Sequence, residues 1–86
     1  MSITPKLTGR ALILASGPTS PDATDVIDKA LKDFIHQKGE LQRIDLGGRT
    51  IVALEIRIDP AHARAISEEL ETIGKRANLD IAMELL

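Results

Sequence analysis

The stretch TIVALEIRI, residues 50–58, decides the fold because its side chains alternate between two kinds. Successive side chains of a strand point to opposite faces of a sheet, so this pattern predicts a strand with one buried face. The buried face would carry every second residue, namely Thr50, Val52, Leu54, Ile56 and Ile58. The other face would carry a more polar set, namely Ile51, Ala53, Glu55 and Arg57.

The residues that flank this strand predict a hairpin before it and a helix after it. ELQRIDL, residues 40–46, reads as a weaker strand, and the GGR that follows at 47–49 is typical of a tight hairpin turn. Asp59 and Pro60 indicate a helix start, with an acidic N-cap and a proline at the first helical position. That helix would end at ANLD, residues 77–80, and IAMELL, residues 81–86, would form a last strand.

The first half of the chain predicts one more strand and one more helix. RALILAS, residues 10–16, is a continuous apolar run of strand length. Residues 22–38 repeat with a helical period, and Gly39 would accept the left-handed conformation of a helix stop. The apolar stripe of this helix would be Val26, Ile27, Ala30, Leu31, Phe34 and Ile35. Residues 1–9, with breakers at Pro5 and Gly9, would be a flexible leader ahead of one domain at 10–86.

The predicted order of strand, helix, strand, strand, helix, strand is that of the ferredoxin-like βαββαβ plan, in the α+β class. Right-handed crossovers would place two helices on one face of a four-stranded antiparallel sheet. The expected spatial order is fourth, first, third, second strand. The two most apolar strands would then be central, and the opposite sheet face would be left open.

The composition excludes several classes of function. The 86 residues carry a formal net charge of −2 and one aromatic residue, which disfavours nucleic-acid binding. The absence of cysteine excludes disulfides and thiolate chemistry. No apolar run approaches the roughly 20 residues of a membrane helix, and the start has no signal-peptide core. We therefore expect a cytoplasmic protein without membrane or nucleic-acid partners.

The loop SGPTSPDAT, residues 16–24, joins the first strand to the first helix, and it admits two interpretations. The first is helix initiation, with Ser20 as N-cap, Pro21 at the first helical position and Asp22 in the first turn. The second is a ligand-binding loop, in which Gly17, Thr19 and Ser20 contact a small molecule.

This loop, within a βαββαβ plan of this length, resembles the ACT domain, a small regulatory module that binds amino acids. Residues 10–86 are most similar to the N-terminal ACT domain of actinobacterial phosphoserine phosphatases. The family pattern is approximately Thr-Gly-x-Asp-x-Pro-Gly-x-Thr, followed later by Gly-Arg before the third strand. This sequence matches that pattern at Ser16-Gly17, Pro21, Thr24 and Gly48-Arg49.

The resemblance implies a ligand site at Gly17, Thr19, Ser20, Pro21 and Asp22, with serine as the ligand. Thr19 stands where the family has Asp, and Asp22 stands where it has its second Gly. The Asp22 carboxylate would compete with the carboxylate of an amino acid for the N–H groups of the helix start. The resemblance therefore predicts the fold and a regulatory context, but a blocked amino-acid site in this copy.

Catalytic chemistry has no visible place in the sequence. The Asp-x-Asp-x-Thr nucleophile motif of the phosphatase superfamily does not occur, and neither does Gly-x-Ser-x-Gly or a phosphate loop. His36 and His62 fall in different predicted elements, so no metal or cofactor site is expected. We expect a non-catalytic module, either the N-terminal part of a phosphoserine phosphatase or a freestanding interaction module without a ligand.

Association is expected from the exposed edge and the open face of the predicted sheet. Strand 40–46 would be an edge, and edge strands expose unpaired backbone groups. Arg43 and Asp45 on that strand have opposite charges, which a two-fold related copy could pair. The sequence predicts a homodimer through this edge or through the open face, with contact to the rest of a longer chain as the alternative.

Overall fold

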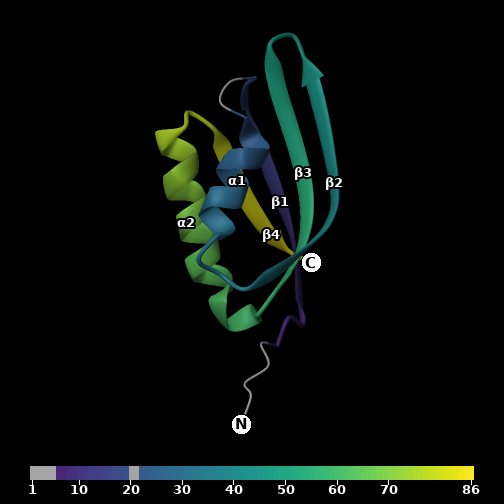
Figure 1. Cartoon of the computed structure of the whole chain (residues 1–86), viewed down its shortest axis with the longest axis vertical. Helices are drawn as coiled ribbons and strands as arrows, with labels where there is room; N and C mark the ends of the chain where they lie inside the picture. The colour runs from purple at the N-terminus through teal and green to yellow at the C-terminus, as the bar shows by residue number, and fades with distance from the viewer. Residues whose placement is uncertain (1–5, 20–21) are drawn as a thin grey trace.

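A computed structural model describes residues 6–19 and 22–86 and contains the predicted ferredoxin-like α+β fold. The strands are β1 (Gly9–Pro18), β2 (His36–Leu46), β3 (Arg49–Ile58) and β4 (Asp80–Leu85). The helices are α1 (Ala23–Leu31), the short 3₁₀ helix η1 (Pro60–His62) and α2 (Ala63–Arg76). The sheet order β2-β3-β1-β4, antiparallel throughout, is the predicted order, and both long helices lie on one side of the sheet (Figure 1).

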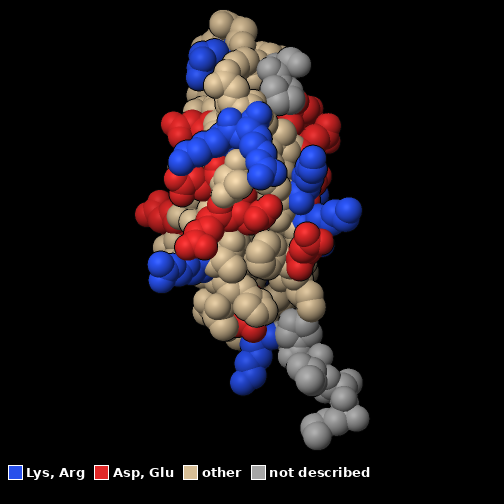
Figure 2. All heavy atoms as spheres, turned by 90° about the vertical axis from the view of Figure 1, so that its left-hand side faces the viewer, with Lys and Arg blue, Asp and Glu red and all other residues tan. Residues whose placement is uncertain are grey.

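The core lies between the sheet and the helices, as the alternation in the sequence predicts. On β3 the residues from Thr50 to Ile58 at even positions are all buried, and β1 contributes Ala11, Ile13 and Ala15. The helices cover these side chains with Ile27 and Leu31 from α1, and with Ile66 and Leu70 from α2. Figure 2 shows acidic and basic side chains interspersed over the molecule's helix-bearing side, which leaves a solvated outer surface.

Two turns follow the residue chemistry read from the sequence. Gly47 and Gly48 have φ of 62° and 76°, which is the double left-handed conformation of a tight hairpin turn between β2 and β3. The Asp59 side chain accepts a hydrogen bond of 3.0 Å from the Ala61 backbone N–H, ahead of Pro60. Asp59 therefore caps the helical segment as predicted.

The prediction of a helix over residues 22–38 was wrong in its second half. Helix α1 ends at Leu31, a turn closed by the Phe34 N–H on the Leu31 carbonyl follows, and β2 begins at His36. Phe34 still packs against the core, but Ile35 is 61% exposed. The pairing of β2 with β3 begins at His36↔Ile58 and satisfies the backbone hydrogen-bonding groups of β2. A longer α1 would have removed the first residues of β2 from this pairing.

Gly39 is not a helix stop, and His36 is the first residue of β2. Gly39 lies within β2, where the register with β3 shifts between Lys38 and Leu41. A Cβ at Gly39 would stand 3.0 Å from the Glu55 carbonyl oxygen. The close approach of two backbones at a bulge therefore explains this glycine.

Gly74 in α2 provides a test of the packing between α2 and β4. We expect Gly74→Ala to destabilise the protein, although alanine is the better helix former by about 1 kcal/mol. The added Cβ would stand 2.9 Å from the Leu79 carbonyl oxygen and 2.9 Å from Cγ1 of Ile81. Overpacking of this kind typically costs about 1–3 kcal/mol, so thermal denaturation should show a clearly lowered Tm.

The control is Thr72→Ala, which introduces the same residue at an exposed position of the same helix without adding an atom. We expect it to leave Tm unchanged or to raise it slightly. A Gly74→Ala protein as stable as the wild type would contradict the proposed close contact.

Candidate functional site

The loop after β1 is attached to the β2–β3 hairpin. Strand β1 continues to Pro18, which lies opposite Arg49, and the Thr19 N–H donates a 3.1 Å hydrogen bond to the Gly48 carbonyl. The matched positions Gly17 and Gly48-Arg49 are therefore neighbours in space. Ser20 and Pro21, which the sequence assigns to the same site, lie outside the described residues.

Gly17 is explained by packing inside the domain. It is buried, and a Cβ placed there would lie 2.5 Å from Cδ2 of Leu79 and 3.1 Å from the Asn78 carbonyl oxygen. The segment before β4 thus lies against the end of β1, and a side chain at position 17 would require Leu79 to shift. A role of Gly17 in ligand contact remains a prediction.

Asp22, and not Ser20, is the N-cap of α1. Its backbone is extended, and its Oδ1 accepts a 2.8 Å hydrogen bond from the Thr24 backbone N–H. Its Oδ2 accepts a 2.9 Å hydrogen bond from Nη1 of Arg43 on β2. The carboxylate therefore has both oxygens engaged, one by the helix start and one by a cation of the neighbouring strand.

Arg43 joins this cap to the hairpin. Its guanidinium also donates to both carboxylate oxygens of Asp45, at 3.1 and 3.4 Å. The Thr50 hydroxyl donates a short hydrogen bond to Asp45, and Thr50 is fully buried beneath this cluster. We call these four residues, Asp22, Arg43, Asp45 and Thr50, the Arg43 cluster.

The charges of the Arg43 cluster stabilise one another. Hydrogen bonding to Arg43, followed by hydrogen bonding to the Thr24 N–H, lowers the pKa of Asp22 below its ordinary value. Hydrogen bonding to the Thr50 hydroxyl, followed by hydrogen bonding to Arg43, lowers the pKa of Asp45. Asp22 and then Asp45 raise the pKa of Arg43, so all three groups remain ionised at neutral pH.

The sequence contains a local signal for part of this cluster. A two-residue turn at Gly47-Gly48 places Asp45 directly opposite Thr50, and Arg43 lies on the same face two residues earlier. The sequence does not indicate the contact of Arg43 with Asp22, because this contact depends on where α1 begins relative to the sheet.

A shallow cavity of about 340 Å³ lies at the same end of the sheet. Ser16 at the end of β1, Arg49 at the start of β3 and Asp80 at the start of β4 line it. Lys75 and the backbone around Asn78, which has a φ of 59°, complete it. Its charged lining residues are of both signs, Arg49 and Lys75 on one hand and Asp80 on the other. Within residues 6–19 and 22–86, no cluster of metal-ligating side chains occurs, and no helix is long and apolar enough to cross a membrane.

Comparison with solved structures assigns the fold to a known type. An ACT domain protein from Streptococcus pneumoniae superposes with a TM-score of 0.77 at 13% identity, over 90% of this chain and 89% of that one. The ligand-free regulatory subunit of aspartate kinase from Thermus thermophilus superposes with a TM-score of 0.68 at 18% identity, over 88% of this chain and 50% of that one. A formyltetrahydrofolate deformylase from Burkholderia mallei superposes with a TM-score of 0.76 at 18% identity, over 88% of this chain and 28% of that one.

These similarities establish an ACT-type fold. At identities below 20% they concern the fold alone. The chain spans about half of the aspartate kinase subunit and less than a third of the deformylase. No protein-family model and no curated protein sequence matches the chain.

The Arg43 cluster predicts a specific dependence of stability on pH. A carboxyl group whose pKa is lower in the folded state stabilises that state above its unfolded pKa of about 3.9, and this contribution is lost as pH falls through the folded pKa. We expect Arg43→Gln to bring the pKa of Asp22 closer to its ordinary value. The variant should therefore lose less unfolding free energy than the wild type between about pH 5 and pH 2.

Urea denaturation across this pH range measures the effect. The matched control is Arg49→Gln, because Arg49 is exposed on the adjacent strand and forms no ion pair within the described residues. It should keep the wild-type slope. Identical pH profiles for Arg43→Gln and the wild type would rule out the cluster as a source of acid sensitivity.

Proposed function

We propose that this chain is a non-catalytic regulatory and assembly module of the ACT type. The proposal is supported by the match of about nine-tenths of the chain to an ACT domain protein, and by the similarity to the regulatory subunit of aspartate kinase. The sequence motifs at Gly17 and at Gly48-Arg49 add to this support, since the fold brings them together.

The more specific form of this proposal is the N-terminal part of a phosphoserine phosphatase, with serine as the effector. It rests on the resemblance of the loop and hairpin motifs. The alternative is a freestanding module that binds another protein and no amino acid. In either case one observation favours an amino-acid site that does not bind its ligand, namely that both oxygens of the Asp22 carboxylate are already hydrogen-bonded.

The carboxylate of Asp22 occupies the position that an amino acid's carboxylate would need. The Thr24 N–H at the start of α1 and the Arg43 guanidinium are the natural partners for such a carboxylate. Both are already bonded to Asp22. An incoming ligand must displace a group of equal charge that is attached to the chain and therefore present at high effective concentration.

We therefore expect the wild type to bind serine weakly or not at all and Asp22→Gly to gain binding. Glycine is tolerated at an N-cap at a cost of a few tenths of a kcal/mol, so α1 should persist in the variant. Removal of the side chain frees the Thr24 N–H and Nη1 of Arg43, whose Nε and Nη2 remain bonded to Asp45. Isothermal titration calorimetry with serine should show at least a tenfold gain in affinity.

The control is the double variant Asp22→Gly with Arg43→Gln, which should lose the gained affinity. If the gain instead survives Arg43→Gln and disappears with Arg49→Gln, the ligand lies in the cavity at the sheet end. Tight serine binding by the wild type would refute the blocked site.

We also expect the purified chain not to hydrolyse phosphoserine, because its sequence lacks an Asp-x-Asp-x-Thr nucleophile. Release of inorganic phosphate measures this activity. Turnover that a substitution within residues 1–86 abolishes would overturn the proposal of a non-catalytic module.

A further inference from the structure

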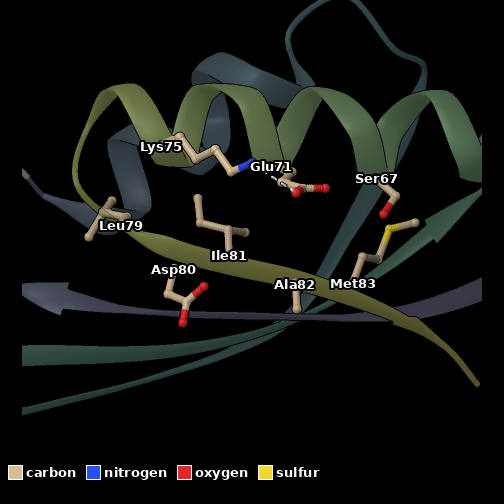
Figure 3. Close-up of a pocket in the computed structure, with 8 residues that line it drawn as sticks. All are labelled: Ser67, Glu71, Lys75, Leu79, Asp80, Ile81, Ala82 and Met83. Carbon is tan, nitrogen blue, oxygen red and sulfur yellow. Dashed lines mark ion pairs between the residues drawn. The ribbon is translucent and has the colours of Figure 1, made fainter.

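The sheet has one face that no helix covers in the part of the chain that the structure describes, since α1 and α2 lie together on the opposite face (Figure 1). Figure 3 shows which side chains of β4 point to this open face. Asp80 and Ala82 are directed away from α2, whereas Ile81 and Met83 are directed toward it. Residues paired across a ladder share a face, so Leu14, the partner of Ala82, also lies on the open face.

An apolar row crosses the open face diagonally. Ile44 on β2 lies opposite Ile51 on β3, and Ala53, the next residue of β3 on this face, lies opposite Leu14 on β1. Leu12 continues the row along β1. Ile44, Ile51 and Leu14 are 56%, 49% and 43% exposed. We call these five residues the open-face row, and large apolar side chains exposed side by side in this way mark an interaction surface.

The width of the open-face row fits a helix better than a second sheet. The row is about two strands wide, or roughly 10 Å, which is close to the diameter of an α-helix with its side chains. Polar side chains border it, since Gln42 lies beside Ala53 and Glu55, bonded to Arg10, lies beside Leu12. A stacked sheet of four strands would bury these groups as well, which is unfavourable.

The border of the row along β4 is acidic. Asp80 and Glu84 both point to the open face, and neither forms an ion pair among the residues that the structure describes. They lie four residues apart, or roughly 13 Å, and helix positions two turns apart are separated by about 11 Å. Arg49 and Arg57 lie on β3, beyond the two ends of the row. A helix with basic residues along one flank therefore complements this border.

A hollow of about 320 Å³ lies between the open-face row and the acidic border. Leu14, Ile51 and Ala82 provide its apolar lining, and Asp80 is the one charged residue that lines it. Arginine and lysine bury an aliphatic stem along apolar surface and carry a cation at its end. Such a side chain fills the hollow and reaches the Asp80 carboxylate, whereas a purely apolar side chain would leave that carboxylate without a partner.

We propose that the open face binds an amphipathic α-helix of a partner protein. The apolar side of this helix covers Ile44, Ile51 and Leu14, and the basic residues of one flank lie along Asp80 and Glu84. One of these basic side chains occupies the hollow. The domain then has helices on both faces of its sheet, which buries the apolar side chains of both faces. The proposal goes beyond the regulatory role and holds whether or not an amino acid binds.

Isothermal titration calorimetry of the whole chain with two synthetic peptides tests the proposal. Both peptides repeat leucine along one side of a helix, and they carry either arginine or glutamate along one flank of the leucine stripe. The arginine peptide should bind the wild type, and the glutamate peptide should bind at least tenfold more weakly. Failure of the arginine peptide to bind, or equal affinities of the two peptides, would overturn the proposal.

The apolar part of the surface is tested with Ile51→Lys, which should weaken binding of the arginine peptide at least tenfold. The matched control is Leu85→Lys, because Leu85 is 57% exposed and follows Met83 on the helix side of the sheet. It should bind the peptide with wild-type affinity. Equal losses in the two variants, or no loss in Ile51→Lys, would contradict binding at the open face.

The acidic border is tested by reversing its charge. The double variant of Asp80→Lys with Glu84→Lys should bind the glutamate peptide more tightly than the arginine peptide. The control is Glu69→Lys with Asp33→Lys, which changes the net charge equally at exposed positions on α2 and in the turn after α1. It should keep the wild-type preference. A preference that both double variants reverse, or that neither reverses, would refute a basic flank along β4.

A second copy of this chain is the competing occupant of the open face, and light scattering distinguishes it. We expect Ile51→Lys to have the same mass as the wild type. A dimer that Ile51→Lys dissociates and Leu85→Lys preserves would identify the second copy as the occupant and overturn the helix proposal. If circular dichroism shows Ile51→Lys unfolded, the charge-reversed variant of β4 decides the question with the two peptides.

Discussion

The pairing of β1 with β3 is the constraint on which the rest of the structure depends. These strands are central, and their register runs unbroken from Gly9↔Ile58 to Pro18↔Arg49. It aligns the buried rows of both strands into one apolar surface, against which both helices pack. Each fully buried Ile, Leu or Val contributes about 1.5–3 kcal/mol, so a slip of one residue would expose the whole row.

The same register determines where the candidate site forms. It brings the end of β1 beside the start of β3, so that the Thr19 N–H reaches the Gly48 carbonyl. The loop to α1 must then pass the hairpin, and Asp22 reaches Arg43 on β2. The Arg43 cluster thus fixes the start of α1 against the sheet. As a consequence, the N–H group of Thr24 at the helix N-terminus is already bonded to the Asp22 carboxylate.

The strands and turns were predictable from the sequence because their signals are local. The alternation at 50–58, the glycine pair at 47–48 and the Asp59-Pro60 cap each determine their own conformation. The end of α1 could not be predicted from the sequence, because Phe34 and Ile35 continue the helical period of the residues before them. Pairing of His36–Leu46 with β3 overrides that local pattern. The N-cap is Asp22 and not the predicted Ser20; Asp22 accepts the Thr24 N–H locally and gains a further hydrogen bond from Arg43, which the local sequence does not indicate.

The two edges of the sheet differ because Arg43 on β2 is bonded to two carboxylates of its own chain. Read from the sequence, Arg43 and Asp45 were opposite charges available to a second copy of β2. In the folded chain they are bonded to each other and to Asp22, so an intermolecular pair would have to break an intramolecular one. The cluster that engages the Asp22 carboxylate therefore also holds the charged side chains of β2 within the chain. Within the described residues, strand β4 takes part in no comparable cluster of ion pairs, and β1 is its one neighbour in the sheet, so the two edges differ in how firmly their side chains are held by the rest of the chain.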